Sequence, residues 1–150
     1  PELSPLSLHD PLPISQKCFM KHYSKGTEMT LIDQLQISNV QLTKNGFTAQ
    51  MQLSFFHAQP QGYLNGGATL AFAEIASGMA SNLLIEKGFF AVGKAIHANH
   101  LAPTKASGIL KAQAILLHKS PHNHLWELSI LNDQNKLISK ITVENAIIKN

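Results

Sequence analysis

Apolar and polar residues alternate in the second quarter of the chain. Over residues 47–56 the apolar side chains of Phe47, Ala49 and Met51 alternate with polar ones, a period of two that is typical of a half-buried β-strand. A preceding strand is predicted over residues 31–42. The segment Lys44-Asn45-Gly46 between the two predicts a hairpin turn, because Asn and Gly tolerate positive φ.

A long run of small and apolar residues follows this hairpin. It predicts a helix over residues 67–87, ended by Gly88. Apolar residues cover nearly every side of the helix, so we expect it to be buried rather than to lie on a surface. Its many Ala, Gly and Ser residues allow its backbone to pack closely against a sheet.

Three or four further strands are expected in the second half of the chain, over residues 91–101, 108–118, 124–131 and 137–148. Ahead of the first strand, four prolines predict an extended lead-in over residues 1–14. A short helix is predicted over residues 15–23, with Cys18 as a packing residue. An antiparallel sheet wrapped round one long central helix is an α+β arrangement.

The composition is that of an ordinary globular protein. A chain of 150 residues buries about 70% of its unfolded surface, so we expect a single domain over residues 1–150. One cysteine excludes an internal disulfide framework and suits a reducing compartment. The chain has neither a signal-peptide pattern nor an apolar stretch long enough to span a membrane, so a cytoplasmic location and no membrane partner are expected.

Charge and motif content exclude several function classes. The net charge is +3, but the lysines are scattered and arginine is absent, so nucleic acid is not an expected partner. Pairs such as His97 and His100, or His122 and His124, have no carboxylate or cysteine at matching spacing, so no metal site is predicted. No Gly-x-Ser-x-Gly elbow is present for a serine triad.

One carboxylate stands out as a candidate for chemistry. Glu74 is the single Asp, Glu, Lys or Arg between Lys44 and Glu86, and it lies in the small, apolar helix. Most helical glutamates are solvated surface residues. A lone carboxylate in such a setting is instead paired, neutral or catalytically employed. The glycine pair Gly66-Gly67 at the helix start forms either a tight turn or a group of free backbone donors.

These residues, with others in the same order and spacing, resemble hotdog-fold acyl-CoA thioesterases. The similarity extends from about Phe19 to the end of the chain and is closest to the phenylacetate-pathway and dihydroxynaphthoyl-CoA thioesterases. The residues that carry it are Gln59-Pro60-x-Gly62, Asn65-Gly66-Gly67, Ala73-Glu74, Gly93, Ala98-Asn99-His100, Leu117-His118 and Trp126.

The resemblance implies a catalytic set. Glu74 would attack the thioester or activate the water that does so. The N–H of Gly66 or its neighbour would bind the thioester carbonyl oxygen, which suits a helix N-terminus. Gln59 would help to place the carbonyl or the water, and Asn65 stands where the family usually has histidine. Asparagine forms hydrogen bonds but does not titrate near neutral pH. The family's Ser or Thr four residues after the glutamate is Gly78 here.

The same resemblance implies a substrate-binding set. Ser77 and Ser81 share a helical face with Glu74 and would orient its carboxylate or a water. The remaining residues would contact the thioester, the pantetheine arm or the phosphates of coenzyme A: Gly67, Gly93, His100, Lys105, His118, Lys119 and Ser120.

The expected function is therefore hydrolysis of an aromatic or medium-chain acyl-CoA, with no cofactor besides the substrate. In this fold the active sites form between subunits, so a homodimer and further a dimer of dimers (a homotetramer) are implied. The alternatives are a non-catalytic acyl-CoA-binding protein of the same fold and, less favoured, a hotdog hydratase or dehydratase. The last class pairs an acidic residue with a histidine near the active loop, a pair that this sequence lacks.

Overall fold

The computed structural model of the protein describes residues 28–150. Residues 31–150 form one compact unit. The predicted lead-in, the helix over residues 15–23 and Cys18 lie outside the described residues, and the single domain over residues 1–150 stays a prediction. No helix within the described range has the length and hydropathy needed to cross a membrane.

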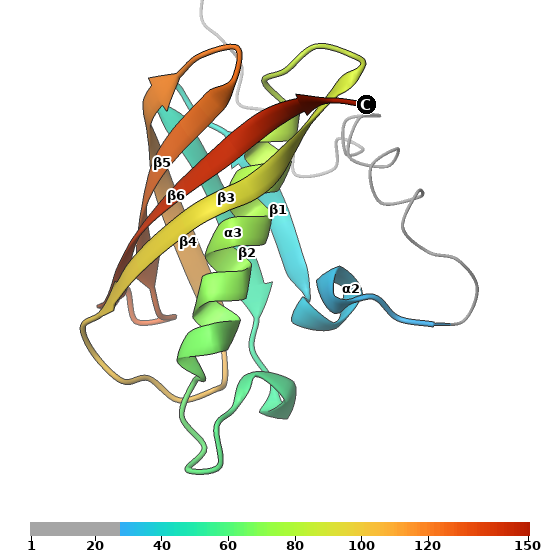
Figure 1. Cartoon of the computed structure of the whole chain (residues 1–150). Coiled ribbons are helices and arrows are strands. Elements are labelled where there is room, and N and C mark those ends of the chain that lie inside the picture. The colour runs from blue at the N-terminus through green and yellow to red at the C-terminus, as the bar shows by residue number, and fades with distance from the viewer. Residues whose placement is uncertain (1–27) are drawn as a thin grey trace, which may run out of the picture. The chain divides into compact units, whose positions relative to one another are not determined.

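Six antiparallel strands form one sheet in the order β1-β2-β4-β5-β6-β3. The strands are β1 (Ile37–Leu42), β2 (Gly46–Gln52), β3 (Phe89–His100), β4 (Ile109–Lys119), β5 (Asn123–Leu131) and β6 (Leu137–Lys149). The sheet curls round the long helix α3 (Gly66–Asn82), with β3 and β6 passing on one side of it and β1 and β2 on the other (Figure 1). This arrangement confirms the predicted α+β hotdog fold.

The helix α3 begins one residue before its predicted start and ends five residues early. Asn65 is its N-cap and Leu83 its C-cap. The Asn82 side chain donates to the Gly78 carbonyl and accepts from the Ala91 N–H, each at 2.9 Å. This amide joins the last helical turn to β3, so the chain leaves the helix there, and Gly88 (φ +89°) lies in the turn that follows.

Two predicted strands are too long. The first half of the segment 31–42 is a short helix, α2 (Leu31–Leu35), whose Leu35 is buried, and β1 starts only after the left-handed residue Gln36. The strand β2 ends at Gln52, and a 3-10 turn, η1 (Phe55–His57), replaces its predicted continuation. The alternation of buried and exposed positions ends at Leu53, because Ser54 and Phe55 are both exposed.

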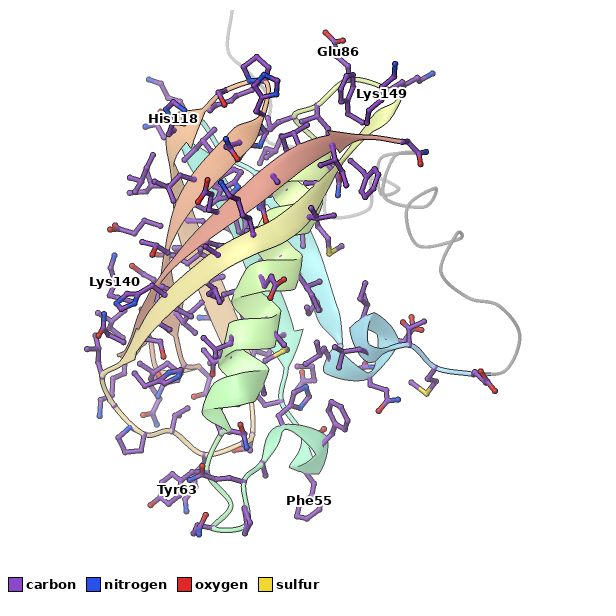
Figure 2. The ribbon with its side chains drawn as sticks, viewed as in Figure 1. Phe55, Tyr63, Glu86, His118, Lys140 and Lys149 are labelled. Carbon is purple, nitrogen blue, oxygen red and sulfur yellow. The ribbon has the colours of Figure 1, made fainter. Side chains whose placement is uncertain are left out.

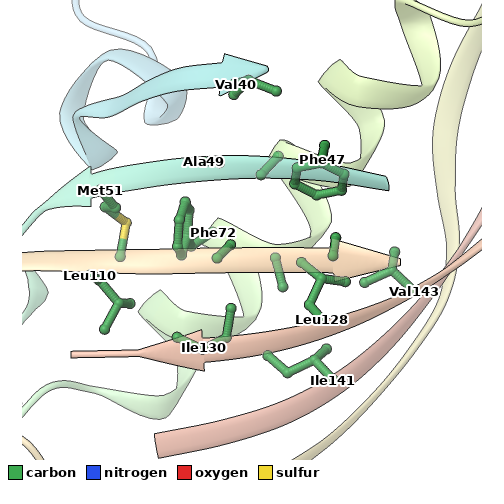
Figure 3. Packing of buried hydrophobic residues seen from close by; sticks show 14 of the residues in the cluster. Val40, Phe47, Ala49, Met51, Phe72, Leu110, Leu128, Ile130, Ile141 and Val143 are labelled. Carbon is green, nitrogen blue, oxygen red and sulfur yellow. The ribbon is translucent and has the colours of Figure 1, made fainter. Parts of the chain in front are cut away.

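The core lies between the concave face of the sheet and one side of α3. Figure 3 shows Phe72 of α3 among Phe47 and Met51 of β2 and Leu110 of β4, all fully buried. The Phe47 ring meets Trp126 edge-to-face, with centroids 5.0 Å apart. Each such side chain contributes about 1.5–3 kcal/mol by burial. The prediction of a helix buried on nearly every side does not hold within one chain, because Gly67 and Glu74 are exposed.

Candidate active site

A cleft of about 330 Å³ opens at the N-terminal end of α3. It gathers Gln59 from the loop after η1, Gly66 from the helix start and His100 from the end of β3. Thr69, Thr104 and Ser139 complete its polar lining. Three of the residues singled out in the sequence therefore lie together although they come from separate segments.

The helix start distributes its backbone donors unequally. The Asn65 side-chain oxygen accepts the Gly67 N–H at 2.8 Å, and the Asn65 carbonyl accepts the N–H groups of Ala68 and Thr69. The Gly66 N–H has no acceptor among residues 28–150. The first N–H groups of a helix lack intrahelical partners, and here the cap satisfies Gly67 and leaves Gly66 available. Direct carbonyl binding by Gly67 is therefore corrected: its N–H belongs to the cap.

The loop that carries Gln59 is tied down by its backbone. The Gln59 N–H donates to the Tyr63 carbonyl and the Gly62 N–H donates to the Gln59 carbonyl, both at 2.8 Å, with Gly62 at φ +78°. The Gln59 side-chain amide makes no hydrogen bond to any residue that the structure describes. A held backbone with an unpartnered amide leaves the side chain free to contact a ligand.

His57, which anchors this loop, was not predicted as a functional residue. His57 is buried, its Nδ1 accepts from the Ser54 N–H at 3.0 Å, and its Nε2 lies 3.1 Å from the Leu35 carbonyl. Because the Ser54 N–H can only donate, Nδ1 accepts and Nε2–H donates, so one neutral tautomer satisfies both bonds. The only signal was Ser54 three residues before His57, a capping spacing usually completed by Glu or Gln.

Glu74 lies outside this cleft, on the exposed side of α3. Its carboxylate rests against the backbone of Gly93 in β3, at a bulge between Gly93 and Ala95, and a Cβ at position 93 would overlap it. Gly93 was predicted to contact coenzyme A; its observed role is to leave room for Glu74. Glu74 follows Gly66 by eight positions, so the two are about 12 Å apart along the helix axis.

The roles predicted for Ser77 and Ser81 need correction. Both are fully buried. The Ser77 hydroxyl donates to the Glu74 backbone carbonyl at 2.9 Å, not to its carboxylate. The Ser81 hydroxyl accepts from Trp126 Nε1 at 2.8 Å and from Asn145 Nδ2 at 3.1 Å. These hydroxyls hold the helix against the sheet, because β5 and β6 cover this part of α3.

A second pocket, of about 530 Å³, lies at the other end of α3. Lys119 at the end of β4 lines it with Ser120 and His122 of the β4–β5 turn, the buried His124 and an apolar wall that includes Phe89. Burial, and then the nearby charges of Lys119 and His118, lower the pKa of His124 from 6.5. The imidazole is therefore neutral at neutral pH, and its buried Nδ1 has no partner among the described residues.

The basic residues assigned to coenzyme A are divided between these two ends. In Figure 2 His118 and Glu86 lie at one end of the molecule and Tyr63 at the other. The Lys105 ammonium lies 4.0 Å from the centre of the Tyr63 ring, so Lys105 belongs to the end that holds the N-terminal cleft. A single chain thus does not bring Lys105 and Lys119 to one place.

Comparison with known proteins identifies the family of the chain. The sequence model of the Thioesterase superfamily matches residues 61–139. The chain belongs to the thioesterase superfamily. Members of it hydrolyse thioesters, and the chain is an enzyme of this class.

Individual thioesterases in the superfamily are similar over most of the chain. The 1,4-dihydroxy-2-naphthoyl-CoA hydrolase of Listeria monocytogenes is 32% identical over 77% of this chain and 94% of its own. The crystal structure of yhdA from Lactococcus lactis is 48% identical, covers 81% of this chain and 99% of its own, and has a TM-score of 0.78. A Staphylococcus aureus protein, solved as a glutamate-to-alanine mutant, is 30% identical. It covers 81% of this chain and 100% of its own, and has a TM-score of 0.74.

The described histidines and carboxylates do not gather into a metal site. Between residues 28 and 150 no three His, Cys, Asp or Glu side chains are grouped so as to hold an ion. The ion pairs Lys94–Glu144 and Lys140–Glu127 are partly exposed and join neighbouring strands.

Proposed function

We propose that the protein hydrolyses acyl-CoA thioesters and that the Gly66 N–H binds the thioester carbonyl oxygen. This free donor at the start of α3 carries the proposal. Gly66 lines the cleft that also holds the unpartnered Gln59 amide. A backbone N–H at a helix N-terminus stabilises the negative charge that develops on the carbonyl oxygen during attack.

Glu74 supplies the base or the nucleophile. As a base it takes a proton from water, and the hydroxide adds to the carbonyl carbon. As a nucleophile its carboxylate adds directly and forms an acyl anhydride that water then opens. In both routes the carbon–sulfur bond breaks, the thiolate of coenzyme A takes a proton, and the acyl group leaves as a carboxylate. Water is the only other reactant, so the reaction uses no cofactor.

The reaction needs two copies of the chain. Gly66 and Glu74 of one helix are about 12 Å apart, too far to act on one carbonyl carbon. The strand β3 is a twelve-residue edge of the sheet and, among the described strands, pairs only with β6; its outer residues include the exposed Ile96. A second copy paired antiparallel along this edge brings the Glu74 of one chain towards the Gly66 of the other. We therefore propose a homodimer, with a dimer of dimers as the full assembly.

The two ends of α3 then serve one substrate. In such a pair the C-terminal pocket of one chain approaches the N-terminal cleft of the other. The proposed phosphate contacts are Lys119, Ser120 and His118 near the β4–β5 turn, with Lys105 of the opposite chain at the cleft. A lysine ammonium binds phosphate as a point charge, so these contacts anchor the nucleotide without fixing its orientation.

An aromatic acyl group is the proposed substrate class, with medium-chain acyl groups as the second choice. The Listeria relative is named for an aromatic acyl-CoA. The Staphylococcus aureus thioesterase has also been solved with a glutamine replaced, and this glutamine and the replaced glutamate are as far apart in sequence as Gln59 and Glu74. This spacing supports the assignment of that pair to the reaction.

The first experiment replaces Glu74. We expect Glu74→Gln to lower kcat for benzoyl-CoA by about 10²–10⁴-fold, the usual contribution of a positioned base, and to leave the oligomer intact. Released thiol measures the reaction and light scattering measures the mass. The matched control is Glu127→Gln, which removes only a partly exposed ion pair. Full activity in Glu74→Gln overturns the proposal, and tight benzoyl-CoA binding without turnover in the native protein selects the non-catalytic alternative.

A single-turnover reaction in heavy-oxygen water tests the nucleophile role of Glu74. A base route, or an anhydride opened at the acyl carbon, places the label in the released acid during the first turnover, so only label in the protein establishes the anhydride. An anhydride route opened by attack on the Glu74 carbon places it in the protein instead. Mass analysis of the acid and of the peptide that contains Glu74 distinguishes these results.

A further inference from the structure

His100 and Ser139 form a pair that sequence spacing does not reveal. They lie directly opposite each other in the β3–β6 ladder. His100 Nδ1 and Ser139 Oγ are 2.9 Å apart, and Ser139 is only 1% exposed. One edge of the imidazole is thus held by a buried hydroxyl.

The other edge of the ring faces the cleft at the helix start. His100 lines the same cleft as Gln59 and Gly66. A methyl group built on Gly66 would lie 2.8 Å from His100 Nε2, so this nitrogen lies directly beside the helix start. His100 Nε2 makes no hydrogen bond to any residue in the described range. The free nitrogen of the ring therefore lies beside Gly66, whose own N–H is also free.

The Ser139 hydroxyl decides which nitrogen of His100 carries the proton. Its hydrogen bond with His100 is the only one that Ser139 Oγ makes among residues 28–150. If Nδ1 carried the proton, the buried hydroxyl hydrogen would have no acceptor, which is unfavourable for a buried donor. If Ser139 donates to Nδ1, both groups are satisfied. The favoured neutral tautomer therefore places the proton on Nε2, facing the cleft.

We propose that His100 Nε2–H is the second donor to the thioester carbonyl oxygen, beside the Gly66 N–H, and that Ser139 is a positioning residue that sets the His100 tautomer. This inference rests on the proposed thioesterase reaction and adds the side-chain half of the oxyanion site. It also gives the cleft an imidazole donor although position 65 is an asparagine whose oxygen caps the helix. The pair acts by donating hydrogen bonds, and no bond of the protein is made or broken.

Two substitutions of His100 separate the role of each nitrogen. His100→Gln keeps an amide donor at the reach of Nε2, whereas His100→Asn keeps an amide at the reach of Nδ1, near Ser139. We expect His100→Asn to lower kcat for benzoyl-CoA by about 10²-fold, the loss of one oxyanion donor, with little change in KM. His100→Gln should retain most of the rate. Equal, native rates in both variants overturn the donor role.

The role of Ser139 is tested by the tautomer itself. Nitrogen NMR of the His100 ring should report Nε2–H in the native protein and a tautomer mixture in Ser139→Ala, with kcat reduced and KM kept. Ser129→Ala, at a partly exposed position on β5, is the matched control. A His100 ring that is protonated at Nδ1 in the native protein overturns the inference. This measurement needs no variant, so the inference is tested even if Ser139→Ala does not fold.

Failure of this inference is distinguishable from failure of the proposed function. If Glu74→Gln is inactive while His100→Asn is as active as the native protein, the hydrolase stands and the His100 donor falls. If Glu74→Gln is fully active, the proposed function is wrong. The tautomer measurement then still decides whether Ser139 sets the tautomer of the His100 imidazole.

Discussion

The two sides of α3 use the same kinds of polar group in opposite ways. On the side that faces the sheet, Ser77 and Ser81 are buried, and their hydroxyls are engaged by Asn145 and Trp126. On the open side Glu74 is exposed, and the Gly66 N–H at its end has no protein acceptor among residues 28–150. Polar groups in a core must be satisfied for the chain to fold. Groups left unsatisfied near a cleft are available to a substrate.

The two sides of α3 show that the role of a helical polar residue follows from its hydrogen-bond partners and not from its spacing in the sequence. Ser77 and Ser81 share the nominal face of Glu74, and spacing alone placed them in the site. Their hydrogen bonds place them in the core instead. Substitutions on the open side should therefore change activity with little effect on stability, and substitutions on the buried side should do the reverse.

The largest expected effect after that of Glu74→Gln comes from filling the space under its carboxylate. Gly93→Ala adds a Cβ where the Glu74 carboxylate now rests, so the carboxylate must move. A shift of about 1 Å at a catalytic group can lower the rate by about 10²-fold. Measured kcat should fall towards that of Glu74→Gln, while the melting temperature changes little because Gly93 is exposed.

Gly78→Ala is the matched control, because nothing lies within 4 Å of a Cβ built at that helical glycine. Activity of Gly93→Ala equal to that of Gly78→Ala would contradict the placement of Glu74 on Gly93. The double variant Gly93→Ala with Glu74→Gln should be no slower than Glu74→Gln alone.

On the buried side, Ser81→Ala removes the acceptor of the Trp126 indole N–H. A buried donor left without a partner costs about 1–3 kcal/mol of unfolding free energy. Urea unfolding should show this loss, and kcat of the folded protein should be unchanged. Ser129→Ala on β5 is the control. A large fall in kcat for Ser81→Ala would return Ser81 to the active site.

Substitution of the helix N-cap, Asn65, should change stability less than Ser81→Ala does. Asn65→Ala removes the oxygen that accepts the Gly67 N–H, and loss of such a cap costs about 1 kcal/mol. Asn65→His is expected to keep or raise turnover, since the family usually has histidine here. Thermal melting and thiol release measure the two effects. A complete loss of turnover in Asn65→His would show that Asn65 has a catalytic role of its own.

The smallest expected effect is the contribution of His124, near the C-terminal end of α3, to the dependence of stability on pH. Burial and neighbouring positive charge hold the pKa of His124 below 6.5 in the folded protein. The unfolded chain therefore binds more protons once the pH falls below 6.5, and stability is lost until the pH reaches the folded pKa. One such group changes the free energy of unfolding by at most about 1.4 kcal/mol per pH unit.

Urea unfolding from about pH 8 to about pH 5 measures this slope. His124→Gln should flatten it, and His97→Gln, at an exposed position on β3, should leave it as in the native protein. An identical slope in native protein and His124→Gln would exclude His124 as its source.

Most of the fold was predictable because its signals are local. Alternation in residues 47–53, the turn at Asn45-Gly46 and the small-residue run around Glu74 each act over a few neighbours, and all five strands predicted after residue 47 are present. The secondary-structure prediction is wrong where a short apolar segment is compatible with two kinds of element. The segment around Leu31 and Leu35 fits a strand or one helical turn, and burial of Leu35 against the core decides for the helix.

The sequence by itself determined the order of the elements, the glycine pair at the helix start and the lone carboxylate, because these depend on which residues are neighbours in the chain. Only the tertiary structure decided that Asn65 caps the helix and leaves the Gly66 N–H free, that Glu74 lies on Gly93, and that Ser139 holds His100 beside the helix start. These contacts join strands and helix ends far apart in sequence. Strand register and helix packing set them, and residue spacing carries no direct record of either.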